Sequence, residues 1–436
     1  MKDALGFVRG MLVPLALIGA AVRPVSAVVA IPADPGCEGY QVWTTQSNPR
    51  SDSTGLNNSA YPEANATYWA TQVTGTADTM VTTHGQYPLA RYVSFQLYDD
   101  NRNVLDSLND VAINPDSGQN NPYRSGTDQG TYTVHLVFGR KPIKPRANTI
   151  YTAGLTSAAL VYRIYYSNNP DDLSGSTPLP SITIDGVEQI SCPPRPIIVP
   201  EDATVWGRLD NGEFFGNKPS NLLSFSAANP PIWSLVTTNQ NTPYYPSEDN
   251  SYMAAVISRD YLNAPFPYDL LVLRFAAPTV PDTQAGVPPY AAAQVRFWSL
   301  CQDEPITTSV VRCTPDNVAL NRDGFVTFVV SDPSKRPADD ILAQWGAGWM
   351  PWGALQPNDV VYDIDDNPLT NASGVFYNGL LLYRQTMADP FFAQSIANVA
   401  QLSPRLRKDA MGDYWPAIGY CSAASFQTLG SGCIGQ

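Results

Sequence analysis

Short apolar stretches rich in β-branched and aromatic residues recur along the chain, and Gly, Pro, Asn and Asp bound each of them. This pattern is typical of β-strands joined by turns. In residues 131–138 every second side chain is apolar, which would bury one face of a strand and leave His135 on the other face. On this basis we predict strands at residues 91–98, 131–138, 158–166, 270–276, 294–300 and 325–330.

The chain also repeats itself. The segment YPEANATYWA at residues 61–70 matches YPSEDNSYMA at residues 245–254. Four further short matches fall in the same order in both halves, and this shared order indicates a duplication. They pair Val42-Trp43 with Val205-Trp206, 94–100 with 297–303, 130–138 with 324–332, and 159–163 with 380–384, the last aligning Tyr162-Arg163 with Tyr383-Arg384.

We therefore expect a mainly β protein of two related antiparallel β-sandwich domains. Helical patterns are limited to residues 335–345 and 388–401 in the second half, where Asp389 would cap the second helix. A Pro-rich segment between the halves reads as a stiff linker. The expected boundaries are residues 28–192 for the first domain, 193–200 for the linker and 201–436 for the second domain with its helical insertions.

Residues 1–27 have the pattern of a targeting segment. Lys2 and Arg9 precede the apolar run at residues 11–22, and Val25-Ser26-Ala27 reads as a small-residue cleavage site. Twelve apolar residues are too few to cross a bilayer, so a removed signal peptide is favoured over a membrane anchor. We expect a protein that is secreted or resides in the lumen of the secretory pathway, without stable membrane insertion.

The six cysteines agree with an oxidising compartment, since no CxxC spacing suggests a zinc or thioredoxin-type site. Six cysteines allow about 15 pairings, so spacing alone does not fix the connectivity. The economical pattern joins Cys301 to Cys313, Cys421 to Cys433 and Cys37 to Cys192. Glycosylation sequons, which suit a eukaryotic secretory route, occur at Asn57, Asn65 and Asn371.

Composition removes several classes of function. The chain has 436 residues, with 26 Lys and Arg against 39 Asp and Glu, which gives a net charge of −13. Nucleic-acid binding draws mainly on clustered Lys and Arg. We expect no basic cluster in this chain, so nucleic acid is not an expected partner. The 39 prolines also disfavour long helices.

The residues offer little support for hydrolytic or metal chemistry. Only two histidines, His84 and His135, are present, and no G-x-S-x-G motif accompanies them. The acids at residues 363–366 have calcium-loop spacing, but Pro368 and Gly374 stand where an EF-hand needs Gly and Glu, so an acidic turn is favoured. We expect no metal and no cofactor.

Large aromatic residues gather in the second half. Trp345, Trp349 and Trp352 lie in a Gly- and Pro-containing segment that predicts a loop. One interpretation is an aromatic pocket for an apolar ligand, in which Tyr383 and Arg384 are catalytic; the alternative is that the rings fill the core and the repeated Tyr-Arg pair is structural. The other residues assigned to that pocket are Phe391, Tyr414 and Trp415.

These segments support two resemblances. RYVSFQLYDDNRNVLDSLNDVAINPD at 91–116, TYTVHLVFG at 131–139 and LVYRIYY at 160–166 resemble widespread secreted β proteins of undetermined function. The whole arrangement, exported, duplicated in β structure and lacking a metal or hydrolase signature, also resembles the fungal hetero-Diels–Alderases of tropolone-sesquiterpene biosynthesis. No catalytic residue of that family can be transferred position by position.

The second resemblance implies a cofactor-free cyclase that joins an apolar polyene to a quinone methide derived from a hydroxymethyl tropolone. Such a reaction requires that both partners be positioned together and that water be excluded. Two alternatives are a secreted, non-catalytic protein that binds small molecules, and a carbohydrate-active β-sandwich with paired carboxylates beside the Trp segment. The expected partners are apolar small molecules, and the sequence does not define an oligomeric state.

Overall fold

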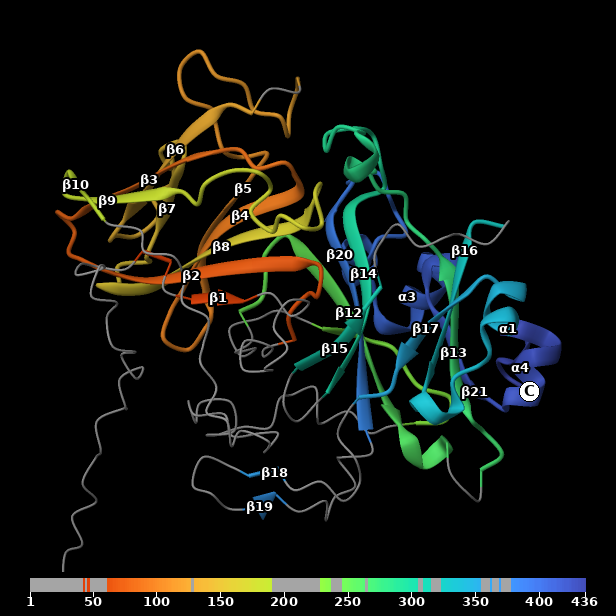
Figure 1. The fold of residues 1–436 in the computed structure, drawn as a ribbon. Helices are drawn as coiled ribbons and strands as arrows, with labels where there is room; N and C mark the ends of the chain where they lie inside the picture. The colour runs from red at the N-terminus through yellow and green to blue at the C-terminus, as the bar shows by residue number, and fades with distance from the viewer. Residues whose placement is uncertain are drawn as a thin grey trace, which may run out of the picture. The chain divides into compact units, whose positions relative to one another are not determined.

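The first half of the chain folds into two five-stranded sheets, coloured red to yellow in Figure 1. One has the order β1-β2-β8-β4-β5 and the other β10-β9-β3-β6-β7. Apolar side chains of both sheets, among them Phe95, Tyr132 and Tyr162, form one buried core. The strands are β1 (Thr45–Ser47), β2 (Ala66–Thr74), β3 (Met80–Gln86), β4 (Ala90–Tyr98), β5 (Val104–Asn109), β6 (Thr131–Val137), β7 (Thr149–Tyr151), β8 (Ser157–Ser167), β9 (Ser181–Ile184) and β10 (Val187–Glu188).

The second half forms a five-stranded sheet of order β11-β12-β20-β14-β15 and a four-stranded sheet of order β17-β16-β13-β21. These sheets enclose a second core that includes Phe275, Trp298 and Tyr383. Strands β18 and β19 pair only with each other. The strands are β11 (Ser234–Val236), β12 (Asn250–Ser258), β13 (Leu270–Ala276), β14 (Val295–Glu304), β15 (Ser309–Cys313), β16 (Phe325–Ser331), β17 (Ala347–Pro351), β18 (Val361–Tyr362), β19 (Pro368–Leu369), β20 (Asn378–Ala388) and β21 (Ala417–Cys421).

The computed structural model places both pairs of sheets in one unit, residues 39–436. It describes residues 42–43, 45–47, 61–126, 129–189, 228–236, 245–262, 266–304, 309–314, 323–353, 361–362, 368–369 and 378–436. The predicted signal peptide, the linker, the acidic turn at 363–366, Cys37, Cys192, Asn57 and Asn371 lie outside these residues. The domain boundaries therefore remain predictions, while the mainly β fold class is confirmed.

The order of strands repeats between the halves, as the sequence matches predicted. The order β1-β2-β8-β4-β5 corresponds strand by strand to β11-β12-β20-β14-β15, and β9-β3-β6-β7 corresponds to β21-β13-β16-β17. The matched segments fall on equivalent strands: β2 with β12, β4 with β14, β6 with β16 and β8 with β20. All six strands predicted from periodicity are present, and the apolar face of β6 is buried while His135 is exposed.

Two details differ from the predicted antiparallel sandwiches. In each half one strand pair is parallel, β6 with β7 and β16 with β17. The Trp segment is therefore not a loop, because Trp349 lies within β17 and Trp345 ends helix α1 (Asp339–Gln344). β17 is an edge strand, where Pro351 is tolerated because its missing N–H is not required by a second neighbour.

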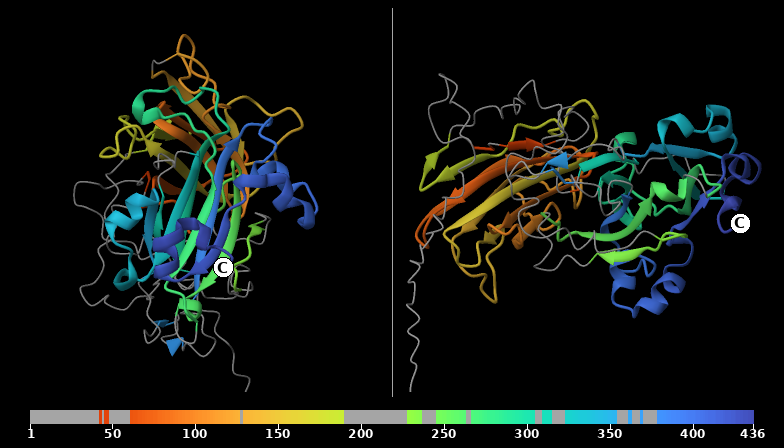
Figure 2. Two further views of the ribbon diagram at one scale, coloured as in Figure 1. Left: turned by 90° about the vertical axis from the view of Figure 1, so that its right-hand side faces the viewer. Right: turned by 90° about the horizontal axis from the view of Figure 1, so that it is seen from below.

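The α-helices of the described residues belong to the second half and lie on the outside of its sheets (Figure 2). The helix expected at 388–401 is shorter than predicted, because Ser395 is its N-cap and accepts a hydrogen bond from the Asn398 backbone N–H. Asp389 instead accepts the Phe391 N–H at 2.7 Å and closes a turn. The remaining helices are α2 (Ile396–Ala400), α3 (Pro404–Met411), α4 (Ala423–Leu429) and the 3-10 helices η2 (Arg259–Leu262), η3 (Thr283–Ala285), η4 (Pro333–Lys335), η7 (Gly412–Tyr414) and η8 (Gly430–Cys433).

Two of the predicted disulfides are confirmed. Cys301 is bonded to Cys313, and Cys421 is bonded to Cys433. The first links neighbouring strands β14 and β15, in which these residues are direct partners. The second ties β21 to the 3-10 helix η8 near the C-terminus. The pairing of Cys37 with Cys192 stays a prediction.

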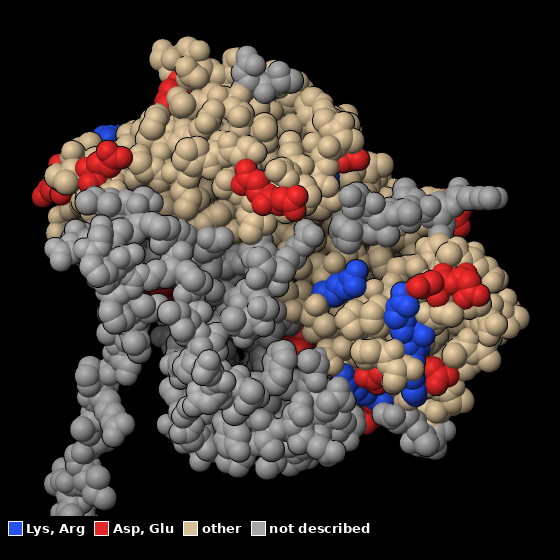
Figure 3. Space-filling view, viewed as in Figure 1, with Lys and Arg blue, Asp and Glu red and all other residues tan. Residues whose placement is uncertain are grey.

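The surface carries few charged side chains. On the face shown in Figure 3, most of the described surface is neither acidic nor basic, which agrees with a charged content of only 15%. Across the part of the chain that is described, no helix has the length and apolarity needed to span a bilayer. Two large apolar side chains, Ile143 and Phe391, are almost fully exposed.

Candidate functional site

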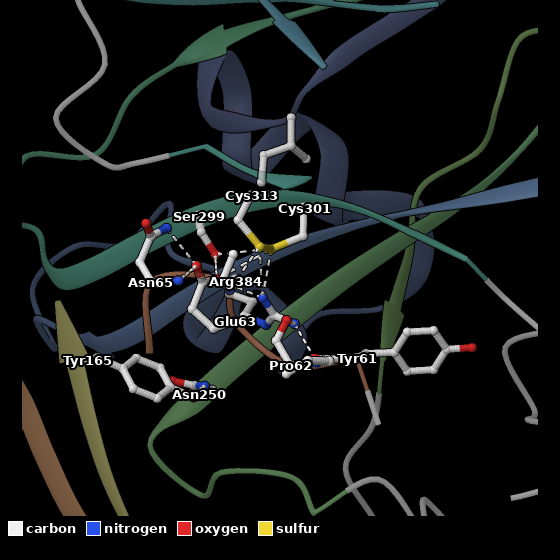
Figure 4. Close-up of polar contacts among 12 residues, drawn as sticks. Tyr61, Pro62, Glu63, Asn65, Tyr165, Asn250, Ser299, Cys301, Cys313 and Arg384 are labelled. Atoms are coloured by element: carbon white, nitrogen blue, oxygen red, sulfur yellow. Dashed lines mark hydrogen bonds and ion pairs between the residues drawn. A yellow bond between two sulfur atoms is a disulfide. The ribbon is translucent and has the colours of Figure 1, made fainter. Parts of the chain in front are cut away.

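A buried polar cluster surrounds Arg384 in β20 (Figure 4). In a strand, consecutive side chains point to opposite faces. Tyr383 therefore points into the core of the second half, whereas Arg384 points away from that core and is buried against residues of the first half. The equivalent Tyr162 and Arg163 in β8 follow the same rule.

The Arg384 guanidinium joins the two halves of the chain. Its Nη1 lies 2.7 Å from Glu63 Oε2 and 2.8 Å from Cys301 Sγ. Its Nη2 donates to the backbone carbonyls of Tyr61 and Pro62. Arg384 thus forms a buried ion pair with Glu63 and also binds the Tyr-Pro segment that precedes β2.

Glu63 is fully buried, and its carboxylate is well supplied with donors. Oε1 accepts the Asn65 backbone N–H at 3.0 Å and the Asn65 Nδ2 at 2.8 Å, while Oε2 accepts the Ser299 hydroxyl. The Asn65 Nδ2 is the atom that a glycan would occupy. Because it faces a buried carboxylate, this geometry argues against Asn65 as a glycosylation site.

Arg163 makes the reciprocal contact from the first half. Its Nη2 donates to the Tyr245 carbonyl at 2.8 Å and to the Tyr98 hydroxyl. Tyr98 in turn donates to the Pro246 carbonyl at 2.8 Å. The arginine of each half therefore binds the Tyr-Pro segment of the other half, an arrangement that we call the reciprocal clasp.

Further contacts extend the same symmetry. The Gln96 side chain donates to Ser247, and its counterpart Ser299 donates to Glu63, the counterpart of Ser247. The two tyrosines that open the Tyr-Pro segments, Tyr61 and Tyr245, both have left-handed backbone angles, with φ of 51° and 49°. A strained conformation at both positions indicates that the same turn is held in place twice.

A second buried carboxylate near Arg384, that of Asp303, has no hydrogen-bond donor among the described residues. Asp303 at the end of β14 is fully buried, and neither of its oxygens accepts a hydrogen bond from the described residues. Burial raises the pKa of Asp303 well above its ordinary value, and the charges of Glu63 and Glu304 oppose the lowering effect of Arg384. Burial disfavours the charge on Arg384, yet Glu63 and Asp303 raise its pKa above the usual range.

This cluster does not supply a metal site or a catalytic centre. Glu63, Cys301 and Cys313 bring three ligand-type atoms within 4.8 Å of one another. The two sulfurs are joined as a disulfide, so they are not available as thiolate ligands. The cluster is therefore best described as a structural ion pair between the two halves.

The predicted catalytic pair is separated by the fold. Tyr383 and Arg384 lie on opposite faces of β20, so they cannot act on one substrate. The Tyr383 hydroxyl is buried and accepts a hydrogen bond from Gln385 Nε2 at 2.9 Å. Burial raises the pKa of Tyr383, and no solvent reaches its ring. These contacts favour the structural alternative for both residues, and their assignment as catalytic stays a prediction.

The six aromatic residues assigned to a substrate pocket do not surround a common space. Trp352, Tyr414 and Trp415 pack against the main core of the second half. Trp345 and Trp349 belong to a different cluster, formed with α4 and η8. The last of the six, Phe391, is 95% exposed. Apart from Trp352, which is buried, and Phe391, the rings are partly buried against two different clusters, so the described residues give no support to the interpretation that they line one chamber.

The polar partners of the indoles are ordinary structural contacts. Trp349 Nε1 donates to Ser331 at 3.0 Å, and Trp345 Nε1 donates to the Gln427 carbonyl at 3.3 Å. Trp352 is covered by the guanidinium of Arg259 at 5.6 Å. Among these contacts of the described residues there is no pair of carboxylates of the kind that a glycosidase requires.

The two histidines also make local contacts only. His84 lies in β3, with its Nδ1 3.2 Å from the Thr133 hydroxyl. His135 Nδ1 is 3.4 Å from the Thr82 hydroxyl across the same strand pair. Both histidines are exposed and contact a threonine across the β3–β6 strand pair.

A hollow of about 170 Å³ lies at the start of β14 and the end of β20. Most of its lining residues are apolar in type, but the surface that they expose to the hollow is mainly polar, and two of them are charged. Both charges have partners: Arg296 Nη1 is 3.3 Å from Asp110 Oδ1, and Asp389 holds the turn at Phe391. The lining residues are Pro281, Pro289, Tyr290, Ala291, Ala292, Ala293, Val295, Arg296, Met387 and Asp389.

A smaller hollow of about 20 Å³ occupies the related position in the first half. Tyr166 lines the small hollow and Met387, its counterpart in the repeat, lines the large one. Both residues have left-handed backbone angles, with φ of 55° and 47°, and both donate their N–H to the segment before β2 or β12. The large hollow has room for a ligand, whereas the small one has room for about one water molecule.

Sequence reasoning missed the residues that complete the clasp. Glu63 and Asp303 were not singled out, although both lie inside segments of the internal repeat. The matched Tyr-Pro and Tyr-Arg pairs were the available signal, because two motifs repeated together can be partners. The large hollow gave no signal, since its wall is a run of Pro and Ala that resembles an ordinary turn.

Comparisons with known proteins identify no family. No protein-family model matches the chain, and no curated protein matches it. Among solved structures it is similar to an uncharacterised protein from Burkholderia cenocepacia, with 14% identity, a TM-score of 0.46 and coverage of 88% of this chain and 84% of that chain. It is also similar to a structural-genomics protein from Vibrio parahaemolyticus, with 12% identity, a TM-score of 0.36 and coverage of 76% and 86%. These likenesses are too distant to carry function.

Proposed function

We propose that the protein is an exported, non-catalytic binding protein that takes a small organic ligand with a polar group in the large hollow. The observation that carries this proposal is the hollow itself, because it is large enough for a small ligand and combines Pro, Ala, Val and Met side chains with polar surface that can orient such a ligand. The two disulfides support export, since such bonds persist in oxidising compartments.

The size and wall of the hollow define the ligand class. An apolar cavity of about 150 Å³ can hold a single benzene ring, so a volume of about 170 Å³ suits one ring with a small substituent. The Arg296 guanidinium lines the hollow and binds the Arg91 carbonyl and Asp110 through Nη1, so its other N–H donors suit an anionic or carbonyl oxygen. We expect benzoate-like probes to bind more tightly than benzylamine.

The test is calorimetric titration of the full chain with benzoate, benzylamine and cyclohexanecarboxylate. Ala291→Trp should fill the hollow and weaken benzoate binding at least tenfold. Ala424→Trp, on the exposed face of α4, is the matched control and should bind like the unaltered chain. Absence of binding for all three probes, or equal binding by both Trp variants, would overturn the proposal.

The cyclase hypothesis stays a second candidate with less support. A hetero-Diels–Alder reaction needs both partners in one space, whereas the hollow suits one ring. Supplying a polyene together with a quinone methide precursor separates the two proposals. Faster adduct formation that Ala291→Trp abolishes would contradict a non-catalytic role, while an unchanged rate would remove the cyclase.

A further inference from the structure

The loop between β6 and β7 carries a concentrated positive charge that the sequence reading overlooked. Residues 140–146 read Arg-Lys-Pro-Ile-Lys-Pro-Arg, and every one of them is exposed. Four cations within seven residues are unusual in a chain of net charge −13. We call this segment the basic loop.

An apolar side chain stands in the middle of the basic loop. Ile143 lies between two prolines and is 101% exposed, so it has no packing role in the molecule. Leu155, which is 42% exposed, follows Gly154, and Gly154 lies beside the aliphatic part of Arg140. The basic loop therefore presents Ile143 among its cations, and Leu155 follows a residue that lies beside Arg140.

Most of the charge on the basic loop is available to a partner. Lys141 pairs with the buried Asp106 at 2.7 Å. Within the described part of the chain, no ion pair engages Arg140, Lys144 or Arg146. Three positive charges thus remain uncompensated beside the exposed isoleucine.

The acidic residues of the same sheet lie mainly at its far edge. Asp185 and Glu188 belong to the β9–β10 hairpin, and the order β10-β9-β3-β6-β7 places three strands between β10 and β7. That spacing is about 19 Å, beyond the screening length of about 8 Å at physiological salt. Asp78, in the turn before β3, is the remaining acid at this end of the sheet.

We infer that the basic loop is a docking surface for an anionic lipid membrane. Cations attract the lipid phosphates and serine headgroups, and an exposed apolar side chain between them can enter the boundary between headgroups and acyl chains. A soluble polyanion such as a sulfated glycan would use the cations but not Ile143. This contact is peripheral and involves no membrane-spanning segment.

The test is co-sedimentation of the full chain with phosphatidylserine–phosphatidylcholine vesicles and with vesicles of phosphatidylcholine alone. We expect binding to the anionic vesicles only, with a loss as NaCl is raised. The variant I143S/K144Q should bind at least about fivefold more weakly, since one lysine near an anionic surface contributes about that factor.

The matched control is L406S/K408Q, which likewise replaces one exposed apolar side chain with Ser and one exposed Lys with Gln, in helix α3. This control should bind vesicles as the unaltered chain does. Both variants should have the same thermal unfolding midpoint as the unaltered chain. Equal loss in both variants, equal binding to neutral vesicles, or no vesicle binding would overturn the inference. Retention on heparin without vesicle binding would assign the loop to a soluble polyanion instead. None of these outcomes depends on the hollow.

Discussion

Arg163 and Arg384 occupy equivalent positions in the two halves, yet their positive charges are compensated differently. Arg384 pairs with the carboxylate of Glu63 and lies near Asp303. Arg163 has no ion pair within the described part of the chain; it binds the Tyr98 hydroxyl and the Tyr245 carbonyl. Its guanidinium also lies over the rings of Tyr68 and Tyr98, at 5.6 and 5.5 Å.

Two substitutions within the repeat explain this difference. Glu63 corresponds to Ser247, and Tyr98 corresponds to Cys301. Where the first half supplies an acid, the second half supplies only a hydroxyl, so the opposing arginine must rely on neutral oxygens and aromatic faces. The comparison teaches that the position of the arginine follows from the fold, whereas its electrostatic partner was free to change.

The largest expected effect comes from removing the two arginines in turn. Arg384→Met should lower the free energy of unfolding by about 3 to 5 kcal/mol, because it leaves Glu63 charged and buried without a cation. Arg163→Met should cost about 1 to 3 kcal/mol, because only neutral acceptors lose their donor. Urea denaturation at pH 7, followed by Trp fluorescence, measures both, and an equal loss would show that the ion pair adds nothing.

An intermediate effect, of opposite sign, is expected at Asp303. Asp303→Asn should raise the free energy of unfolding at pH 7 by about 1 to 3 kcal/mol, because the unfolded chain ionises this carboxyl freely whereas the folded chain buries it without a hydrogen-bond donor. Its repeat counterpart Asp100 is exposed, so Asp100→Asn should change stability by less than about 0.5 kcal/mol. A destabilised Asp303→Asn would mean that Arg384 needs the second carboxylate.

Asp303 also predicts the sign of a pH dependence. Its pKa is higher in the folded chain than in the unfolded chain, so the folded state binds the extra proton between those two values. The stability contributed by this group should therefore increase as the pH falls from 7 toward the unfolded pKa. The urea midpoint, measured at several pH values, should change less with pH in Asp303→Asn than in the unaltered chain. In Asp100→Asn it should change with pH as in the unaltered chain.

The smallest expected effect concerns the tyrosines beside the arginines. Tyr383→Phe removes the acceptor of the Gln385 amide and should cost about 1 kcal/mol. The repeat has Ile164 where the second half has Gln385, so Tyr162→Phe has no such amide to lose and should cost less. Benzoate binding should be unchanged in both variants; a loss in Tyr383→Phe would return this residue to a ligand site.

Periodicity and the internal repeat predicted most of the fold. Alternation placed the strands, and the order of the matches predicted that the sheets would repeat, because both signals are local in sequence. The partner of Arg384 could not be found in this way, since Glu63 lies 321 residues away and only the pairing of the halves brings them together. Burial of a charge likewise depends on that pairing.

The packing of the aromatic residues could not be predicted from the sequence, for a physical reason. In the sequence, a Trp that packs in a core and a Trp that lines a pocket look alike, because both lie among apolar residues. Gly348 was read as a sign of a loop, but it lies in β17, where a side chain would collide with the Phe328 ring at 2.9 Å. The basic loop was overlooked because charge was counted over the whole chain, which is acidic.

The reciprocal clasp has a consequence for the ancestry of the chain. In a symmetric dimer, residue i of one subunit meets residue j of the other and j meets i, which is the relation of Arg163 and Arg384 to the two Tyr-Pro segments. The protein thus retains, within a single polypeptide, the contact geometry of two identical subunits. After a gene fusion each copy can mutate separately. Glu63, which pairs with Arg384 while Arg163 has Ser247 at the equivalent position, is a difference of the kind that such divergence produces.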